Sequence, residues 1–197
     1  RAVRGEGSIL EAIKKPDVAA EITLQPVRRH GVDAAVLYSD IVVPPHAVGF
    51  GIDVAPGTGP VAGHALRSSA DLARLRPLEL SDIEYVSETV TILARELSVP
   101  LLAFAGAPFT VASYLIEGRP SRTYQNTKKM MHTDEVLWHE VMERLVQHSV
   151  LFISAQLTAR GHFPEICSRL PFPKMLPRTW SFGKGRPPET GRDRARC

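Results

Sequence analysis

The sequence predicts a parallel α/β fold in which helices cover both faces of a sheet. Three observations indicate this: helical and apolar segments alternate along the chain, the two strand candidates at 34–39 and 100–105 are mostly apolar, and a loop follows each of them. Strands without a polar face are typical of parallel sheets buried between helices. A doubly wound sheet and a (β/α)8 TIM barrel both fit this pattern. A barrel would be incomplete here, because it needs eight strands and about 250 residues.

The overall composition is that of a soluble globular domain. The 197 residues carry a net charge of +3, 44% of them are apolar and 23% are charged, which is typical of folded proteins. Two cysteines are too few for a disulfide scaffold, and no apolar run approaches the ~18 residues of a membrane span. The first residues, Arg1 to Glu6, do not form a secretory signal. We therefore expect a cytoplasmic protein without a membrane partner, whose sequence begins inside a longer chain.

The carboxyl-terminal segment 162–197 differs sharply in composition from residues 1–161. It has six prolines and a net charge of +5, whereas residues 1–161 carry −2. A stretch this rich in proline and arginine buries too little apolar surface to offset its ordering entropy. We expect a disordered basic tail or, because helical periodicity stops abruptly at Gly161, a stretch read in a shifted frame. The slightly acidic balance of residues 1–161 gives no reason to predict a nucleic-acid partner.

Residues 17–30 are predicted to form the first long helix. Asp17 is a suitable N-cap, and Gly31 suits the left-handed position that ends a helix. Pro26 lies within this segment and predicts a kink or an early end, because proline lacks the amide hydrogen that the helix needs. The connection 42–63 is so rich in proline and glycine that no regular element is expected in it.

Three further helices are predicted after residue 80. The helix at 82–97 has an apolar stripe, and Ser81 with Glu84 forms the pattern of a capping box at its start. The helix at 109–116 is expected to end near Gly118. The longest helix is predicted over residues 133–159, with an apolar face formed by Trp138, Val141, Leu145, Phe152 and Leu157.

Functional side chains are expected on the loops after the strands, since parallel α/β folds place their sites at the carboxyl ends of strands. Asp40 is the first charged residue after the strand at 34–39. The segment 104–110 (FAGAPFT) ends the second strand candidate and leads to Tyr114. An aspartate in this place could also cap a turn, and a tyrosine could belong only to the core. From the residues alone, both interpretations remain open.

Other motifs do not form a metal or nucleotide site. His132, His139 and His148 lack the i, i+4 spacing of a zinc-binding helix and are interpreted as solvated surface residues. The GFG and GTG motifs at 49–51 and 57–59 lack the strand–turn–helix setting of a dinucleotide fingerprint and suit turns instead. We therefore expect no metal site.

Several motifs together resemble those of a known family. They are YSDIVVP (38–44), PGTGP (56–60), FAGAPFTVASYLIEG (104–118) and SRTYQNTKKMM (121–131). In this order they resemble the uroporphyrinogen decarboxylase family of haem biosynthesis, over about residues 1–161. The resemblance implies a (β/α)8 barrel, a homodimer and a carboxy-lyase without a cofactor. Its tetrapyrrole substrate, uroporphyrinogen III, would lose carbon dioxide from four acetate side chains to give coproporphyrinogen III.

The resemblance assigns roles to four residues. Asp40 matches the aspartate that faces the centre of the tetrapyrrole and accepts hydrogen bonds from its pyrrole NH groups. An anion there would stabilise the cation that forms when a pyrrole carbon is protonated before carbon dioxide leaves. Tyr114 matches a tyrosine whose hydroxyl could contact a substrate carboxylate or orient Asp40. Phe104 and Gly106 match positions that line the substrate pocket.

The resemblance also implies that parts of the family's site are missing from this sequence. An arginine motif that binds substrate carboxylates would precede Arg1, and further strands with substrate-binding residues would follow Gly161. With two of eight strands, we expect the 197-residue chain alone to have little or no activity. Two alternatives remain: a methyltransferase of the same barrel superfamily, and a non-catalytic truncated product whose basic tail binds anions.

Overall fold

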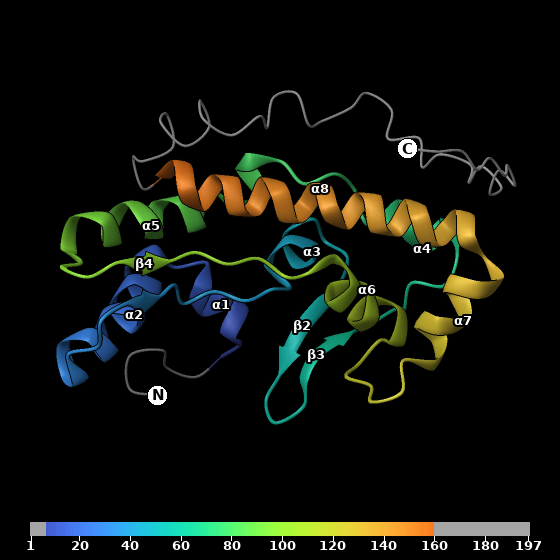
Figure 1. Cartoon of the computed structure of the whole chain (residues 1–197), viewed down its shortest axis with the longest axis horizontal. Helices are drawn as coiled ribbons and strands as arrows, with labels where there is room; N and C mark the ends of the chain where they lie inside the picture. The colour runs from blue at the N-terminus through green and yellow to red at the C-terminus, as the bar shows by residue number, and fades with distance from the viewer. Residues whose placement is uncertain (1–6, 160–197) are drawn as a thin grey trace, which may run out of the picture. The chain divides into compact units, whose positions relative to one another are not determined.

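The computed structural model describes residues 7–159, so the predicted basic tail at 162–197 lies outside the described residues. Helices and short strands alternate along this part of the chain (Figure 1), which confirms the mixed α/β class. In chain order the elements are α1 (Ile9–Ile13), α2 (Pro16–His30), β1 (Ala35–Val36), α3 (Val43–Ala47), β2 (Ile52–Ala55), β3 (Gly59–Ala62), α4 (Ser69–Arg74), a 3-10 turn η1 (Leu80–Ile83), α5 (Glu84–Glu96), β4 (Leu101–Leu102), α6 (Pro108–Glu117), α7 (Gln125–Thr133) and α8 (Glu135–Ala159).

The two predicted strands pair with each other in parallel, as expected, but they are short. Ala35 lies opposite Leu101, and Val36 lies opposite Leu102. The amide of Leu37 donates one further hydrogen bond, of 3.3 Å, to the carbonyl of Leu102. Within the described residues neither strand has a second neighbour. The regular pairing therefore covers only part of the segments predicted as strands.

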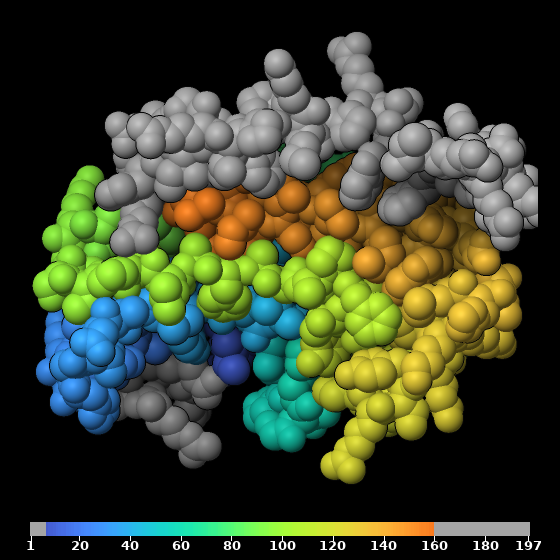
Figure 2. Space-filling view, viewed as in Figure 1, coloured from blue at the N-terminus to red at the C-terminus, as the bar shows by residue number. Residues whose placement is uncertain are grey.

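The prediction that both strand faces are buried is wrong for one face. Ala35, Leu37 and Leu101 are buried, whereas Val36 and Leu102 are 59% and 50% exposed. Successive side chains of a strand point to opposite faces of the sheet, and in the described part of the chain the helices cover one of them. In Figure 2 the yellow-green segment that contains β4 lies uncovered along the middle of the molecule.

Helix α2 begins earlier than predicted and does not end early at Pro26. It begins at Pro16, so Asp17 lies in the first turn and is not the N-cap. Proline is well suited to a first helical position, where its missing amide hydrogen costs nothing. The helix also continues past Pro26 to His30, since its packing against α5 outweighs the loss of one hydrogen bond. Gly31 ends it with φ +59°, as predicted.

The connection 42–63 contains regular structure, contrary to the prediction. Pro44 and Pro45 lie in the first turn of α3, where a helix needs no amide hydrogen. Strands β2 and β3 then form an antiparallel hairpin. Gly57 has φ +75° in the turn between them, a conformation that residues with a side chain rarely adopt. Proline and glycine therefore mark the turns and helix start of this segment, and the interpretation of its glycine motifs as turns is confirmed.

The start of α5 is capped by other residues than those predicted. The 3-10 turn η1 comes first, and its capping box is formed by Glu79 and Asp82 instead of Ser81 and Glu84. The Asp82 carboxylate accepts the amide hydrogen of Glu79 at 2.9 Å and two hydrogen bonds from the Arg76 guanidinium, at 2.6 and 2.8 Å. This interaction with Arg76 is not visible in the local sequence pattern.

The long helix predicted over 133–159 is confirmed as α8, and one helix before it was missed. Helix α6 ends at Gly118 as expected, but α7 precedes the long helix and was not predicted. Asp134 separates α7 from α8 and accepts the amide hydrogen of Leu137 at 3.1 Å. Figure 1 shows α8, in orange, running past β4 and α3. Although α8 has 25 residues, no helix within residues 7–159 is both long and apolar enough to cross a bilayer.

His148 is a core residue, contrary to the prediction of a surface position, whereas His132 and His139 are exposed as expected. The His148 side chain is only 1% exposed, and its Nε2 lies 2.9 Å from the carbonyl oxygen of Arg76. Its Nδ1 has no hydrogen-bond partner among the described residues. Burial lowers the pKa of His148 below its ordinary value of 6.5, because the charged imidazolium would be desolvated.

This histidine is expected to make the fold less stable in weak acid. Below pH 6.5 the unfolded chain binds a proton at position 148 that the folded chain does not, so the free energy of unfolding decreases as the pH falls. His148→Gln keeps a donor for the Arg76 carbonyl and should reduce this decrease between pH 7.5 and 5.5 in urea unfolding. The exposed His139→Gln is the matched control, and an equal effect of both substitutions would contradict the prediction.

Candidate functional site

The first site residue, Asp40, lies in the loop that follows β1. Its Oδ1 accepts the amide hydrogen of Val42 at 3.0 Å, and its own carbonyl oxygen accepts that of Val43 at 3.2 Å. Asp40 therefore shapes the turn that leads into α3, which is the structural role that the sequence left open. This role fixes the carboxylate in one orientation.

The carboxyl group of Asp40 is partly buried. Burial raises the pKa of Asp40 above 3.8, and hydrogen bonds from the amides of Val42 and Ile41 partly offset this. Within residues 7–159, no salt bridge pairs the Asp40 carboxylate with a cation. A partly desolvated anion without a partner interacts strongly with a positive charge that forms nearby.

The second motif region lies directly against the first. A Cβ atom placed on Gly106 would be 2.9 Å from the Cβ of Ile41 and 2.5 Å from Cγ2 of Val111. Both distances are shorter than carbon atoms tolerate, so only glycine fits between the loop after β1 and helix α6. Because Ile41 adjoins Asp40, this contact joins the two loops that the sequence predicted to carry the site.

Two side chains of α8, which the sequence analysis did not identify, hold the loop after β4. The buried Gln156 accepts the amide hydrogen of Phe104 at 3.2 Å and donates to the carbonyl of Phe104 at 3.0 Å. Ser149 donates its hydroxyl hydrogen to the carbonyl of Gly106 at 2.9 Å. A signal for both exists in the sequence: they are polar residues seven positions apart, and each follows an apolar residue of the predicted buried face (Leu145, Phe152) by four positions.

Phe104 and Tyr114 are both half-buried, Phe104 after β4 and Tyr114 on α6. Among the described residues no hydrogen bond joins the Tyr114 hydroxyl to Asp40, so an orienting role of Tyr114 stays a prediction. Gly106 is buried between neighbouring side chains. Its position lining a substrate pocket likewise stays a prediction.

In the described part of the chain, the cavity beside Gly106 is small, and a larger hollow lies elsewhere. A cavity of about 10 Å³ is lined by Ile41, Gly106, His148 and Ser149 among others, which is barely enough for one water molecule. A larger hollow of about 370 Å³ lies between Ser8 and the turn that joins β2 to β3. None of the four predicted site residues lines that larger hollow, so we do not assign it to the same site.

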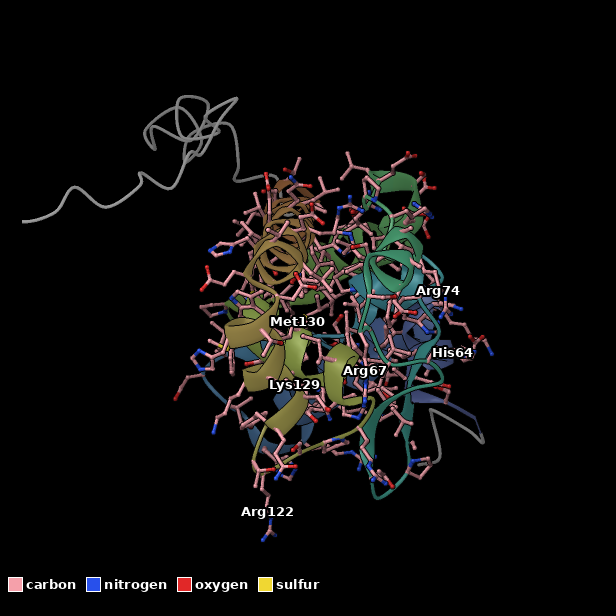
Figure 3. The ribbon with its side chains drawn as sticks, turned by 90° about the vertical axis from the view of Figure 1, so that its right-hand side faces the viewer. His64, Arg67, Arg74, Arg122, Lys129 and Met130 are labelled. Atoms are coloured by element: carbon pink, nitrogen blue, oxygen red, sulfur yellow. The ribbon has the colours of Figure 1, made fainter. Side chains whose placement is uncertain are left out.

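No metal site is present among residues 7–159, where no three histidine, cysteine or acidic side chains come close enough to hold an ion. Three exposed cationic side chains, Arg67, Arg122 and Lys129, are labelled on the side of the molecule shown in Figure 3. No salt bridge in the described part of the chain involves them.

Comparison with known proteins assigns the chain to a family. The family described as "Uroporphyrinogen decarboxylase (URO-D)" matches residues 1–168. The chain belongs to the uroporphyrinogen decarboxylase family. This confirms the resemblance inferred from the sequence motifs.

Individual relatives in the uroporphyrinogen decarboxylase family agree with this assignment. The uroporphyrinogen decarboxylase of Salinispora tropica is 50% identical over 160 residues, and that of Streptomyces coelicolor is 53% identical over 152 residues. These matches cover 81% and 77% of this chain, but only 43% of the length of each relative. The chain thus spans less than half the length of the family members it matches.

A solved structure with a similar fold is a methyltransferase from Methanosarcina mazei. It superposes with a TM-score of 0.56 at 20% sequence identity, and the match covers 80% of this chain and 50% of that one. At this identity the similarity concerns the fold alone.

Proposed function

We propose that the chain forms the amino-terminal part of a uroporphyrinogen decarboxylase and contributes Asp40 to its catalytic site. The observation that supports this most directly is the Asp40 carboxylate: it lies at the carboxyl end of β1, partly buried, oriented by the Val42 amide and without a cationic partner. Curated relatives at about 50% identity carry the decarboxylase name. The substrate would be a tetrapyrrole with acetate side chains, converted from uroporphyrinogen III to coproporphyrinogen III.

The proposed chemistry needs a fixed anion. Protonation of a pyrrole carbon produces a cation that is delocalised onto the ring nitrogen. The bond between the acetate methylene carbon and the carboxylate then breaks, carbon dioxide leaves, and the electron pair of that bond neutralises the cation. A second proton reaches the methylene carbon, the ring loses the first one, and a methyl group remains. Asp40 would accept hydrogen bonds from the pyrrole NH groups and stabilise the cation as it forms.

The other predicted site residues would bind the substrate. The half-buried Phe104 offers an aromatic face to a pyrrole ring, and Gly106 would line the same pocket through its backbone. The Tyr114 hydroxyl would contact a substrate carboxylate. The exposed cations on the side shown in Figure 3, such as Arg122 and Lys129, would attract a substrate that carries several carboxylates.

The architecture we propose is part of a (β/α)8 barrel. Val36 and Leu102 project from the uncovered face of the β1–β4 pair, which is the arrangement expected when further strands and side chains of a barrel are needed to bury that face. We further propose a homodimer in the cytoplasm that uses no cofactor, as the family resemblance implies.

The test is to complete the barrel with a relative. Residues 1–159 would replace the matched region of the Streptomyces coelicolor decarboxylase, so that the parts of that relative before and after the matched region complete the chain. This protein is called the completed enzyme below. The completed enzyme is expected to release carbon dioxide from uroporphyrinogen and to form coproporphyrinogen, whereas the 197-residue chain alone is expected to be inactive. The control is the intact relative, and an inactive but folded completed enzyme would contradict the proposal.

A methyltransferase is the second candidate, favoured by the similar fold of the Methanosarcina mazei enzyme. Its 20% identity is far below the approximately 50% shared with the decarboxylases. Assays of the completed enzyme distinguish the two, since methyl transfer without decarboxylation would support only the second. The remaining alternative, a non-catalytic product with an anion-binding tail, depends on residues 162–197, which lie outside the described residues.

A further inference from the structure

We propose that Gln156 and Ser149 are positioning residues for Asp40, which they influence through the backbone of residues 104–106. Neither side chain hydrogen-bonds to Asp40, whose carboxylate accepts from the loop amides of Val42 and Ile41 within the described residues. The inference rests on the proposed function for the importance of Asp40, but the contacts that support it do not depend on that function.

Gln156 holds the backbone of Phe104 through its side-chain amide. Its side chain is 1% exposed, and its amide group pairs with both backbone groups of Phe104, as a neighbouring strand would. The same nitrogen also donates to the carbonyl of Phe152 at 3.1 Å, one turn earlier in α8. The regular pairing of β4 ends at Leu102, so Gln156 satisfies backbone groups that have lost their strand partner. An unsatisfied buried amide would be costly.

Ser149 and Gln156 hold the same backbone segment from one side of α8. Ser149 and Gln156 are two helical turns apart and therefore lie on the same side of the helix. Ser149 holds the carbonyl of Gly106 while Gln156 holds Phe104. The backbone of residues 104–106 is thus attached to a rigid helix at both ends.

The segment 104–106 contacts the loop that carries Asp40. Gly106 lies so close to Ile41 that a single added carbon atom would approach the Ile41 Cβ to 2.9 Å. A shift of Gly106 toward Ile41 would therefore displace the residue next to Asp40. Because Val42 donates the hydrogen bond that orients the Asp40 carboxylate, the protection of the Val42 amide from hydrogen exchange reports on the order of this loop.

The test uses amide hydrogen exchange in the 197-residue chain, followed by NMR. In Gln156→Leu, protection of the Phe104 amide should fall at least about tenfold because its acceptor is gone. Protection of the Val42 amide, which has no bond to Gln156, should fall by a similar factor, while that of Leu24 in α2 stays unchanged. Gln147→Leu, the same substitution at an exposed position of α8, should change none of the three.

Two outcomes would overturn the proposal. If only Phe104 loses protection, Gln156 acts locally and does not position the Asp40 loop. If all three amides lose protection equally, Gln156 supports only the global stability of the fold. Should Gln156→Leu fail to fold, Ser149→Ala and Ser149→Thr replace it: the first removes the hydroxyl and should lower Val42 protection, and the second keeps it. No loss of Val42 protection in Ser149→Ala would also overturn the proposal. Since turnover enters none of these measurements, an inactive completed enzyme would contradict the proposed function alone.

Discussion

Asp40→Asn is expected to reduce the turnover of the completed enzyme by about 10²–10³-fold, the usual effect of removing one preorganised electrostatic group. Asparagine keeps an oxygen that can accept the Val42 amide hydrogen, so the loop geometry should persist. What is lost is the negative charge that stabilises the protonated pyrrole. The measurement is the rate of coproporphyrinogen formation at saturating substrate, and kcat should fall more than KM rises.

The control for this substitution is Asp33→Asn, which makes the same chemical change at an exposed position shortly before β1. It should leave turnover unchanged. A stability measurement excludes unfolding as the cause: burial raises the pKa of Asp40, so at pH 7 its negative charge lowers the free energy of unfolding relative to a neutral side chain. Asp40→Asn should therefore keep or increase the free energy of unfolding. Full activity of this variant would contradict the assigned role.

Gly106→Ala is expected to destabilise the fold strongly although it adds only one carbon atom. The added carbon would lie 2.5 Å from Cγ2 of Val111 and 2.9 Å from Cβ of Ile41. Relief of such overlaps requires movement of α6 or of the loop that carries Asp40, at a cost of about 1–3 kcal/mol. Urea unfolding of the 197-residue chain measures this cost, and the completed enzyme should lose activity as well.

The matched control is Gly63→Ala. Gly63 has no positive φ, and an added Cβ would lie 3.6 Å from the nearest atom, the carbonyl oxygen of Gly51, an ordinary contact distance. Its replacement should change the free energy of unfolding by less than half as much as Gly106→Ala. Equal changes in the free energy of unfolding for the two substitutions would contradict the prediction that the close contact between Gly106 and Ile41 tolerates no side chain.

Several elements could be predicted because their signals are local. The apolar runs at 34–39 and 100–105 predict β1 and β4, and Gly31 and Gly118 mark helix ends through their left-handed conformation. The family motifs around Asp40 were sufficient to predict the family that the comparisons show. A family motif is defined by residue types in a fixed order, so it can be recognised without knowledge of the fold.

Other features depend on residues far apart in the chain and were missed for that reason. Asp82 caps η1 with the help of Arg76, so the box predicted from Ser81 and Glu84 did not form. His148 lies between Leu145 and Phe152 on the buried face of α8, but a polar imidazole is accommodated there only because the distant Arg76 carbonyl lies beside its Nε2. Both faces of the β1–β4 pair were predicted to be buried, but the face that carries Val36 is exposed. An apolar side chain does not by itself show whether other elements cover it.

The residues and their order were enough to predict the family, the mixed α/β class and the four candidate site residues. The folded chain was needed to show which neighbours these residues contact: Gly106 lies against Ile41, and Gln156 of α8 hydrogen-bonds to the backbone of Phe104. Such contacts are not predicted because their partners are far apart along the chain. Periodicity and capping patterns act over a few residues, whereas these contacts join positions 52 or more residues apart, through side chains whose partners are backbone groups of any residue type.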